Sequence, residues 1–205
     1  MAGDRAETRI QKRNREAILE GALDVFSAKG FRGATLDEIA EAAGLSKPNL
    51  LYYFPSKEAI HRNLIEGLLD DWLAPLKAID GEGEPVDELV GYVLRKLEMS
   101  RTMPRESRLF ANEVLQGAPH VSDTISGRLK ELVDEQAVLL DRWIAGGRLA
   151  PLDPKHLIFS IWATTQHYAD FEVQVAGILG GTPEARISEA RAFLETFYRR
   201  ALTPS

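Results

Sequence analysis

The sequence predicts an all-α fold of about nine helices, and three observations lead to this prediction. Apolar residues recur every three or four positions along most of the chain, which is the periodicity of a helix with one buried face. No segment has the alternating pattern of a half-buried strand. Glycine, proline and small polar residues stand at the ends of the periodic runs, where helices begin and end. With 205 residues, 44% of them hydrophobic, the chain can bury one large helical core or two small ones.

Three helices are expected in the first 54 residues. The apolar face of the first is formed by Ile18, Ala22, Val25 and Phe26. Gly30 is expected to end this helix, because glycine readily adopts the left-handed conformation. Thr35 and Glu38 have the spacing of a capping box that opens the second helix. Ser46 is expected to cap the third, and Pro48 fits its first turn, where amide protons lack helical acceptors.

The second and third helices have the pattern of a helix-turn-helix. The apolar positions that pack inward are Ile39, Leu45 and Leu50. Ala40 is small enough for the next helix to cross over it, and Gly44 can turn the chain with a positive φ. This arrangement is typical of proteins that place a helix in the major groove of DNA.

Helical patterns continue to the end of the chain. A long fourth helix follows Pro55, and Pro75 should bend or end it. The residues from Asp80 to Val86 form the clearest loop. Further helices are expected at about 86–101, 104–116, 122–146, 154–176 and 184–201.

Composition narrows the class of protein. The chain has no cysteine, so disulfides and thiol chemistry are excluded. The N-terminal residues are charged, with no apolar stretch behind them, and the longest apolar run, 157–163, is far shorter than the ~20 residues that span a bilayer. We therefore expect a cytoplasmic protein. The net charge is −6, but residues 1–62 hold ten basic and nine acidic side chains, whereas the remainder holds 15 and 22. The acidic excess thus lies wholly outside the helix-turn-helix.

The sequence contains no pattern that predicts catalysis or metal binding. No Ser/His/Asp set, glycine-rich phosphate loop or cysteine nucleophile is present, so no enzyme is predicted. Glu58 and His61 have the Glu-x-x-His spacing of carboxylate-bridged iron proteins, but that chemistry requires two such pairs and only one occurs. No metal site or cofactor is therefore expected.

The candidate DNA-binding residues are Thr35, Lys47, Asn49, Tyr52, Tyr53 and Lys57. Asn49 suits base edges, and Lys47 suits a phosphate or a guanine. Thr35 stands at a helix N-terminus, where backbone amides can hold a phosphate, and Lys57 lies just beyond the third helix. One of the two tyrosines should pack inward, and we expect Tyr53 to be the one that points outward. A basic cluster ahead of the first helix core is either a solvated terminus or a phosphate-contacting arm; it comprises Arg5, Arg9, Lys12, Arg13 and Arg15.

The three-helix unit, closed by Tyr-Tyr-Phe-Pro-Ser-Lys-Glu-Ala at residues 52–59, resembles the TetR family of transcriptional regulators. The resemblance implies a DNA-binding domain at residues 1–57 and an effector-binding and dimerisation domain at 58–205. It implies a homodimer that binds double-stranded operator DNA and is released by a small molecule. The alternative is a helical dimerisation protein that does not bind DNA.

Further segments resemble a branch of this family that regulates pyrimidine utilisation. They lie at 49–57, 72–77, 107–110, 117–119, 149–151, 153–154, 156–159 and 161–171. The resemblance implies uracil or thymine as the effector, with an unrelated small molecule as the alternative. The candidate ligand-binding residues are Trp72, Asn112, Trp162 and Gln166. Trp162 and Gln166 are one helical turn apart, so they share a face.

The dimer interface is expected in the helices at 154–176 and 184–201. The last helix carries an apolar stripe that would face either a partner or the core of its own chain. The stripe consists of Ile187, Ala190, Leu194, Phe197, Tyr198 and Ala201.

Overall fold

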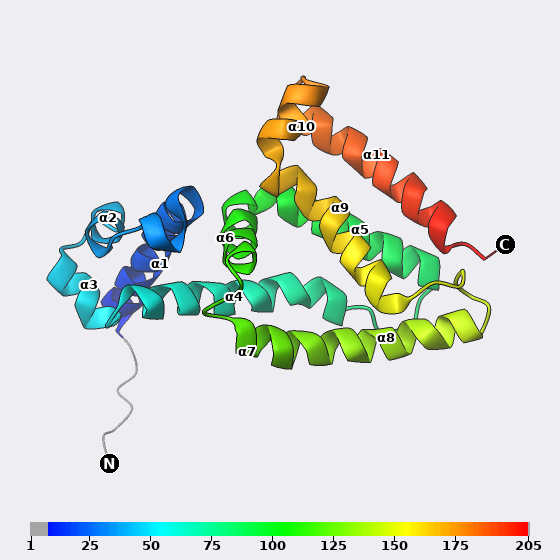
Figure 1. Ribbon diagram of the computed structural model, residues 1–205, viewed down its shortest axis with the longest axis horizontal. Helices are drawn as coiled ribbons and strands as arrows, with labels where there is room; N and C mark the ends of the chain where they lie inside the picture. Colours follow the sequence, from blue (N-terminus) through cyan, green and yellow to red (C-terminus); the bar gives the residue numbers. More distant parts are fainter. Residues whose placement is uncertain (1–7, 205) are drawn as a thin grey trace, which may run out of the picture. The chain divides into compact units, whose positions relative to one another are not determined.

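The computed structural model describes residues 8–204, and within them the chain is all-α, as predicted (Figure 1). The chain divides into two compact units. Unit 1 comprises the residues up to Leu68 together with Arg108–Val121, and unit 2 comprises Leu69–Ser107 and the residues from Ser122 onward. The predicted boundary after residue 57 stays a prediction. No helix among the described residues is long and apolar enough to cross a membrane.

Unit 1 is built on three N-terminal helices. They are α1 (Arg9–Gly33), α2 (Leu36–Ala42) and α3 (Lys47–Tyr53). The unit also includes the first part of α4 (Lys57–Lys77), up to Leu68, and most of α6 (Pro104–Leu115), from Arg108 onward. The backbone of α1 leaves the helical conformation at Gly30, where φ is 67°, and then continues to Gly33. The interruption at Gly30 was predicted, but the helix kinks there instead of ending.

The expected caps of α2 and α3 are confirmed. The Thr35 side chain accepts a hydrogen bond from the backbone of Glu38, whose carboxylate accepts one from the Thr35 backbone. Ser46 accepts from the backbone of Asn49, and Pro48 lies in the first turn of α3. These contacts satisfy backbone amides that have no partner inside the helix, and they fix where each helix begins.

The core of unit 1 forms where the first three helices meet. Its buried apolar side chains include Ile18, Ala22, Phe26, Ile39, Ala40 and Leu50. Gly44 turns the chain between α2 and α3 with a φ of 67°, as the helix-turn-helix pattern predicts. Gly21 of α1 is buried where the end of α2 comes closest. A Cβ built at Gly21 would lie 2.9 Å from the backbone nitrogen of Ala43, so only glycine allows this approach.

We therefore expect Gly21→Ala to destabilise unit 1. The added methyl group would push against backbone atoms of α2, and overpacking of this kind lowers the free energy of unfolding by about 1–3 kcal/mol. Gly67→Ala is the matched control, because Gly67 is also helical but a Cβ there meets nothing within 4 Å. That control should raise stability by up to ~1 kcal/mol through helix propensity alone. Thermal unfolding followed by circular dichroism measures both; equal behaviour of the two variants would contradict the close approach.

Unit 2 contains the second half of α4, α5 (Pro85–Thr102) and five later helical segments. These are α7 (Ser122–Thr124), α8 (Lys130–Ala145), α9 (Pro154–Asp170), α10 (Glu172–Leu179) and α11 (Pro183–Leu202), with a π-helical turn at Ile125–Leu129 between α7 and α8. Helix α4 runs two residues past Pro75, so the proline does not end it there. The single helix expected at 154–176 is wrong, because Phe171 leaves the helical conformation (φ −114°, ψ 30°) and separates α9 from α10.

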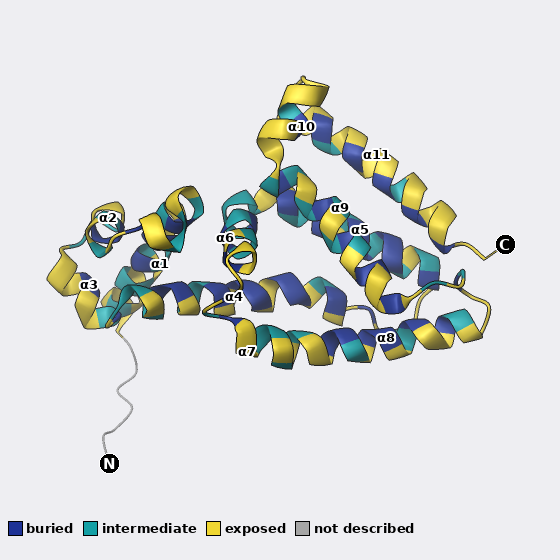
Figure 2. Cartoon of the chain, in the orientation of Figure 1, coloured by how far each residue is buried: buried dark blue, intermediate teal, exposed yellow. Residues whose placement is uncertain are grey.

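The core of unit 2 lies around α5, which packs against both α9 and α11. Many residues of these three helices are buried, and they are coloured dark blue in Figure 2. A hydrogen bond of 2.9 Å from the Ser100 hydroxyl to the backbone oxygen of Thr165 joins α5 to α9. The Tyr198 hydroxyl of α11 is within hydrogen-bonding distance of the hydroxyls of Ser160 and Thr164 on α9. These polar contacts fix the positions of the three helices.

Candidate functional site

Helix α3 presents an exposed polar face. Lys47 and Asn49 are exposed, as predicted, and Tyr52 is 71% exposed. Tyr53, in contrast, is half-buried, and its hydroxyl accepts a hydrogen bond of 3.0 Å from the Asn14 side chain of α1. The expectation that Tyr53 is the tyrosine that points outward is therefore wrong, because Tyr53 is half-buried whereas the neighbouring Tyr52 is mostly exposed.

The exposed face of α3 is held in place by contacts to α1 and α2. The Gln11 side chain lies 3.4 Å from the Tyr52 hydroxyl, and Lys47 Nζ lies 2.9 Å from a carboxylate oxygen of Asp37. The ion pair is exposed, so the lysine can exchange Asp37 for another anion at little energetic cost.

The start of α2 is organised around a carboxylate. Glu38 accepts hydrogen bonds from the Lys29 ammonium at 2.5 Å and from the Thr35 hydroxyl at 2.8 Å. These hydrogen bonds, that of Lys29 first, lower the pKa of Glu38 to about 2. The carboxylate thus stays ionised and keeps the cap intact at neutral pH. A phosphate contact by Thr35 stays a prediction.

Lys57 directs its ammonium group toward other residues of unit 1. Its ammonium donates hydrogen bonds of 2.8 Å to the backbone oxygens of Phe31 and Ala34, and it lies 4.5 Å from the centre of the Phe31 ring. The lysine therefore ties the start of α4 to the end of α1. The phosphate contact expected of Lys57 stays a prediction.

The predicted basic cluster lies largely on a helix. Arg9, Lys12 and Arg13 are exposed on the first turns of α1, and the Arg15 guanidinium stacks 4.6 Å above the Phe54 ring. Arg5 lies outside the described residues. The positions on α1 make these side chains part of a fixed surface of unit 1.

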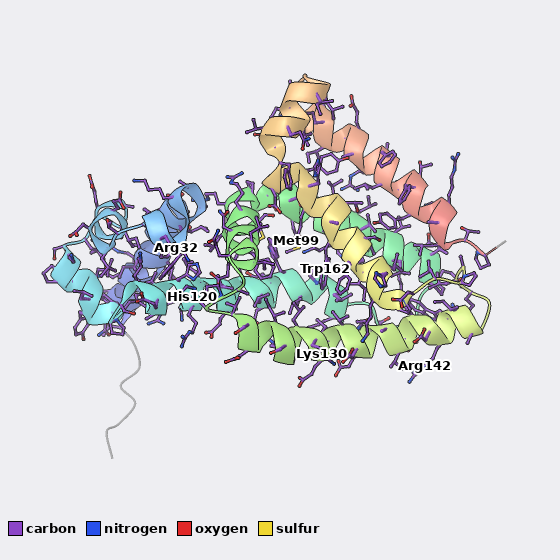
Figure 3. All side chains as sticks on the ribbon, in the orientation of Figure 1. Arg32, Met99, His120, Lys130, Arg142 and Trp162 are labelled. Carbon is purple, nitrogen blue, oxygen red and sulfur yellow. The ribbon has the colours of Figure 1, made fainter. Side chains whose placement is uncertain are left out.

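Unit 2 brings together three aromatic side chains and one buried lysine, namely Trp72, Tyr92, Trp162 and Lys96. We call this group the effector cluster, after the two predicted effector-binding residues that it contains. Trp162 of α9 (labelled in Figure 3) donates a hydrogen bond of 2.7 Å from its indole nitrogen to the Tyr92 hydroxyl of α5. Lys96, one turn further along α5, is 4% exposed, and its ammonium lies 4.5 Å from the centre of the Trp72 ring. The two predicted tryptophans of unit 2 therefore both contact the same face of α5.

Lys96 was not among the predicted site residues, although the sequence holds a signal for it. Leu89, Val93, Lys96 and Ser100 follow one another at intervals of four, three and four residues, which places the lysine on the apolar face of its helix. Gln166 is half-buried on α9, one turn after Trp162. Asn112 is exposed and belongs to unit 1, where it lines a cavity. Effector contacts by Gln166 and Asn112 stay predictions.

Burial changes the acid–base behaviour of Lys96. Desolvation lowers its pKa to about 8, against a smaller opposing effect of the negative charge of Asp170. In the unfolded chain the pKa returns to its ordinary value near 10.5, so above pH 8 the unfolded state binds more protons than the folded state. Stability should therefore rise with pH from about 8 upward.

We expect Lys96→Met to remove this pH dependence. The wild-type free energy of unfolding should increase by roughly 1.5 kcal/mol between pH 8 and pH 9.5 through Lys96, and that part should be missing from the variant. Urea denaturation at both pH values gives the comparison. The comparison stops below pH 10 because burial raises the pKa of Tyr92, so this tyrosine also makes stability depend on pH at higher pH. A pH dependence that is the same in both proteins would show that Lys96 is not desolvated.

The predicted apolar stripe of the last helix divides between two faces. Ala190, Leu194 and Tyr198 are buried in unit 2, so the interpretation as core is correct for these residues. Phe193 and Phe197 are 59% and 47% exposed, and their rings stack with centres 5.8 Å apart. The aromatic pair is thus an exposed apolar surface that the subunit itself does not cover.

Comparisons with known proteins agree with this architecture. Residues 18–64 match the model of bacterial regulatory proteins of the tetR family, and residues 65–205 match the model of the C-terminal region of YcdC-like proteins. The chain is 51% identical over 175 residues to the HTH-type transcriptional regulator RutR of Escherichia coli K12, covering 85% of this chain and 82% of that protein.

Solved structures show the same fold. The ketosteroid transcriptional regulator KstR2 of Mycobacterium tuberculosis aligns over the whole of both chains with a TM-score of 0.75 at 22% identity. The transcriptional regulator SCO4942 of Streptomyces coelicolor aligns over 94% of this chain and 99% of its own, with a TM-score of 0.67 at 26% identity. With both halves matched by family models and a helix-turn-helix that presents its polar face outward, this chain belongs to the TetR family of transcriptional regulators.

Proposed function

We propose that this protein is a cytoplasmic, homodimeric regulator that binds operator DNA through α3 and is released by a free pyrimidine base, uracil or thymine. The effector cluster is the observation that carries the choice of ligand. It combines two flat indole rings with a buried cationic donor, and the 51% identity to RutR supports the same choice. The two regulatory partners of the protein are then double-stranded DNA and a small neutral molecule.

The effector cluster suits the chemistry of a pyrimidine base. A planar ring can stack on the indoles of Trp72 and Trp162. Its ring carbonyls accept hydrogen bonds, which the Lys96 ammonium can donate, and its ring N–H groups donate hydrogen bonds, which the Gln166 side chain can accept. A buried donor or acceptor left unpaired costs about 1–3 kcal/mol, so a molecule that matches these groups gains specificity from them.

DNA binding is assigned to the exposed face of α3. In the proposed dimer, two copies of α3 enter successive major grooves about 34 Å apart, which requires a palindromic operator. Asn49 would contact base edges, and Lys47 and Tyr52 would contact the DNA with their exposed polar ends. Thr35, Tyr53 and Lys57 would support this surface from its edges.

Release requires that the effector bind one state of the dimer better than the other. Helix α4 offers a covalent route for this coupling, because it carries Trp72 in unit 2 and starts at Lys57 in unit 1. An effector that moves Trp72 would move the same helix that is tied to the end of α1. The shift in DNA affinity is limited by the difference in effector affinity between the two states.

Two measurements test the proposal. A thermal-shift screen of free nucleobases should give stabilisation by uracil or thymine and none by adenine. A palindromic duplex, selected from a random-sequence pool with the purified protein, should then be released on addition of the same base. Stabilisation by an unrelated metabolite and not by pyrimidines would show that the effector is not a pyrimidine base. The assignment as a DNA-binding regulator would then still stand.

We expect Lys47→Ala to weaken operator binding and to reduce its salt dependence. Each phosphate contact that is lost should lower the slope of log affinity against log salt concentration by about one. Fluorescence anisotropy with the selected operator at several salt concentrations measures this slope. Lys155→Ala, on α9 of unit 2, removes the same charge from another exposed lysine and serves as the control. An unchanged slope for Lys47→Ala would exclude a phosphate contact.

A further inference from the structure

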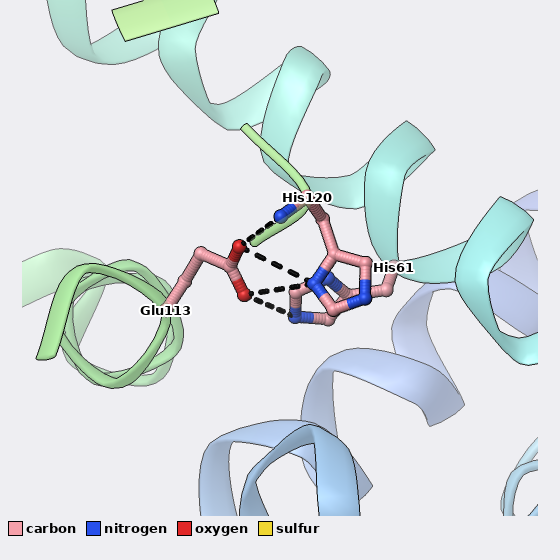
Figure 4. A group of neighbouring side chains, drawn as sticks. All are labelled: His61, Glu113 and His120. Atoms are coloured by element: carbon pink, nitrogen blue, oxygen red, sulfur yellow. Dashed lines mark hydrogen bonds and ion pairs between the residues drawn. The ribbon is translucent and has the colours of Figure 1, made fainter. Parts of the chain in front are cut away.

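Three side chains that serve neither of these sites converge inside unit 1 (Figure 4). His61 lies on α4, Glu113 on α6, and His120 in the segment that follows α6. His120 Nδ1 lies 3.2 Å from Glu113 Oε2, and His61 Nε2 lies 3.8 Å from the same oxygen. One nitrogen from each histidine and one carboxylate oxygen all lie within 4.8 Å of one another.

Two of the three side chains are deeply buried, and hydrogen bonds do not satisfy all of their polar atoms. His61 is 1% exposed and Glu113 is 4% exposed. Among the described residues the Nδ1 atom of His61 has no hydrogen-bond partner, and 3.8 Å is too long for a hydrogen bond from Nε2 to Glu113. A buried imidazole without a hydrogen bond is energetically unfavourable, unless the group has another function.

The three groups are the ligand types that a transition-metal ion prefers. Zn²⁺ binds imidazole nitrogens and carboxylate oxygens at about 2.0–2.2 Å in a tetrahedron, which separates neighbouring ligand atoms by roughly 3.3–3.5 Å. The observed separations of 3.2 and 3.8 Å lie on either side of this range.

Neighbouring groups hold the three side chains in position. The backbone N–H of His120 donates a hydrogen bond of 2.7 Å to Glu113 Oε1, which leaves Oε2 directed toward the two imidazoles. The Phe31 ring packs against both histidine rings, with centres 4.9 Å from His61 and 4.3 Å from His120. Groups that orient the ligands in this way increase metal affinity.

A cavity provides access for an ion and space for a further ligand. Its volume is about 550 Å³, and all three side chains line it together with residues of the α1 end and of α6. A site with three protein ligands and an open side is the arrangement in which a metal retains a water molecule or binds a small anion.

We propose that His61, Glu113 and His120 bind one divalent transition-metal ion, with Zn²⁺ the best fit, and that a water molecule from the cavity completes its coordination. The ion would join α4, α6 and the following segment to one another inside unit 1. Glu58, which the sequence spacing pairs with His61, is exposed and is not one of the three converging side chains. The alternative is a hydrogen-bonded His–Glu–His cluster that binds no metal.

The test uses the full-length protein without a histidine tag, freed of metal by dialysis against a chelator. Co²⁺ is added while visible absorption is recorded, and Zn²⁺ is then added in competition. We expect one equivalent of Co²⁺ per chain with the intense ligand-field bands of a four-coordinate N/O site, and their loss on addition of Zn²⁺. Zn²⁺ should also raise the melting temperature of the wild-type protein.

Matched variants decide whether these three residues hold the ion. Glu113→Gln and His120→Gln should each weaken Co²⁺ binding by at least about tenfold and abolish the thermal shift. His156→Gln, an exposed histidine of unit 2, should change neither. If Glu113→Gln does not fold, His120→Gln decides, because His120 is only partly buried. The proposal is overturned if the wild-type protein takes up no Co²⁺, or if His120→Gln retains wild-type affinity while folded by circular dichroism.

Discussion

Replacement of Lys96 by methionine should strongly weaken the response to uracil and leave operator binding intact. Methionine retains an unbranched apolar stem against Trp72 but removes the ammonium that would donate to a ring carbonyl. A hydrogen bond to a charged group contributes about 1.5–3 kcal/mol, so the affinity for the base should fall roughly 10- to 100-fold. The measurement is a uracil titration of the protein bound to labelled operator DNA.

The matched control for this variant is Lys130→Met. Lys130 is a lysine of α8 in the same unit, and its side chain is exposed. The control should be released by the same uracil concentration as the wild-type protein. Gln166→Leu should reproduce the Lys96→Met phenotype through the loss of the amide. If uracil still releases Lys96→Met at the wild-type concentration, the effector binds elsewhere.

The second large effect is expected on dimer formation, through the exposed aromatic pair of α11. Replacement of both Phe193 and Phe197 by glutamate should convert the dimer to a monomer, because the exposed aromatic pair would become an acidic surface that repels its copy. A monomer binds one operator half-site at a time, so operator affinity should fall by about 100-fold or more. Light scattering coupled to size exclusion gives the mass, and anisotropy gives the affinity.

Two features make this experiment sharper than removal of α11. Leu194 and Tyr198 of the same helix are buried in unit 2, so a truncation would also destroy the core. Val138→Glu on α8 places the same charge on another exposed apolar residue and should remain a dimer with normal affinity. A double variant that is still a dimer would place the interface on a different surface.

The sequence predicts features that depend on neighbouring residues. The cap formed by Thr35 and Glu38 and the turn at Gly44 follow from a few adjacent side chains, and the structure confirms them. The end of α9 at Phe171 was missed, since no glycine or proline stands there to indicate it. Local signals thus located most helices but not a break that lacks a breaking residue.

Features that depend on distant contacts were predicted less well. The direction of the two tyrosines depends on Asn14, which is 39 residues from Tyr53, and no local pattern reports that contact. Lys96 was missed because a lysine is ordinarily exposed, and its burial follows from the packing of α5 against other helices. In the histidine cluster, Glu113 and His120 come from segments more than 50 residues beyond His61, whereas the spacing in sequence indicated Glu58.

The division of α11 into a buried and an exposed face has a consequence for how the regulator is supplied in the cell. Each newly made chain can complete its interior alone, since Leu194 and Tyr198 need no second copy. In the proposed dimer, pairing would then be a separate, concentration-dependent step that covers the two phenylalanines. The amount of protein synthesised would therefore set the fraction competent to occupy a two-fold DNA site, even before any metabolite acts.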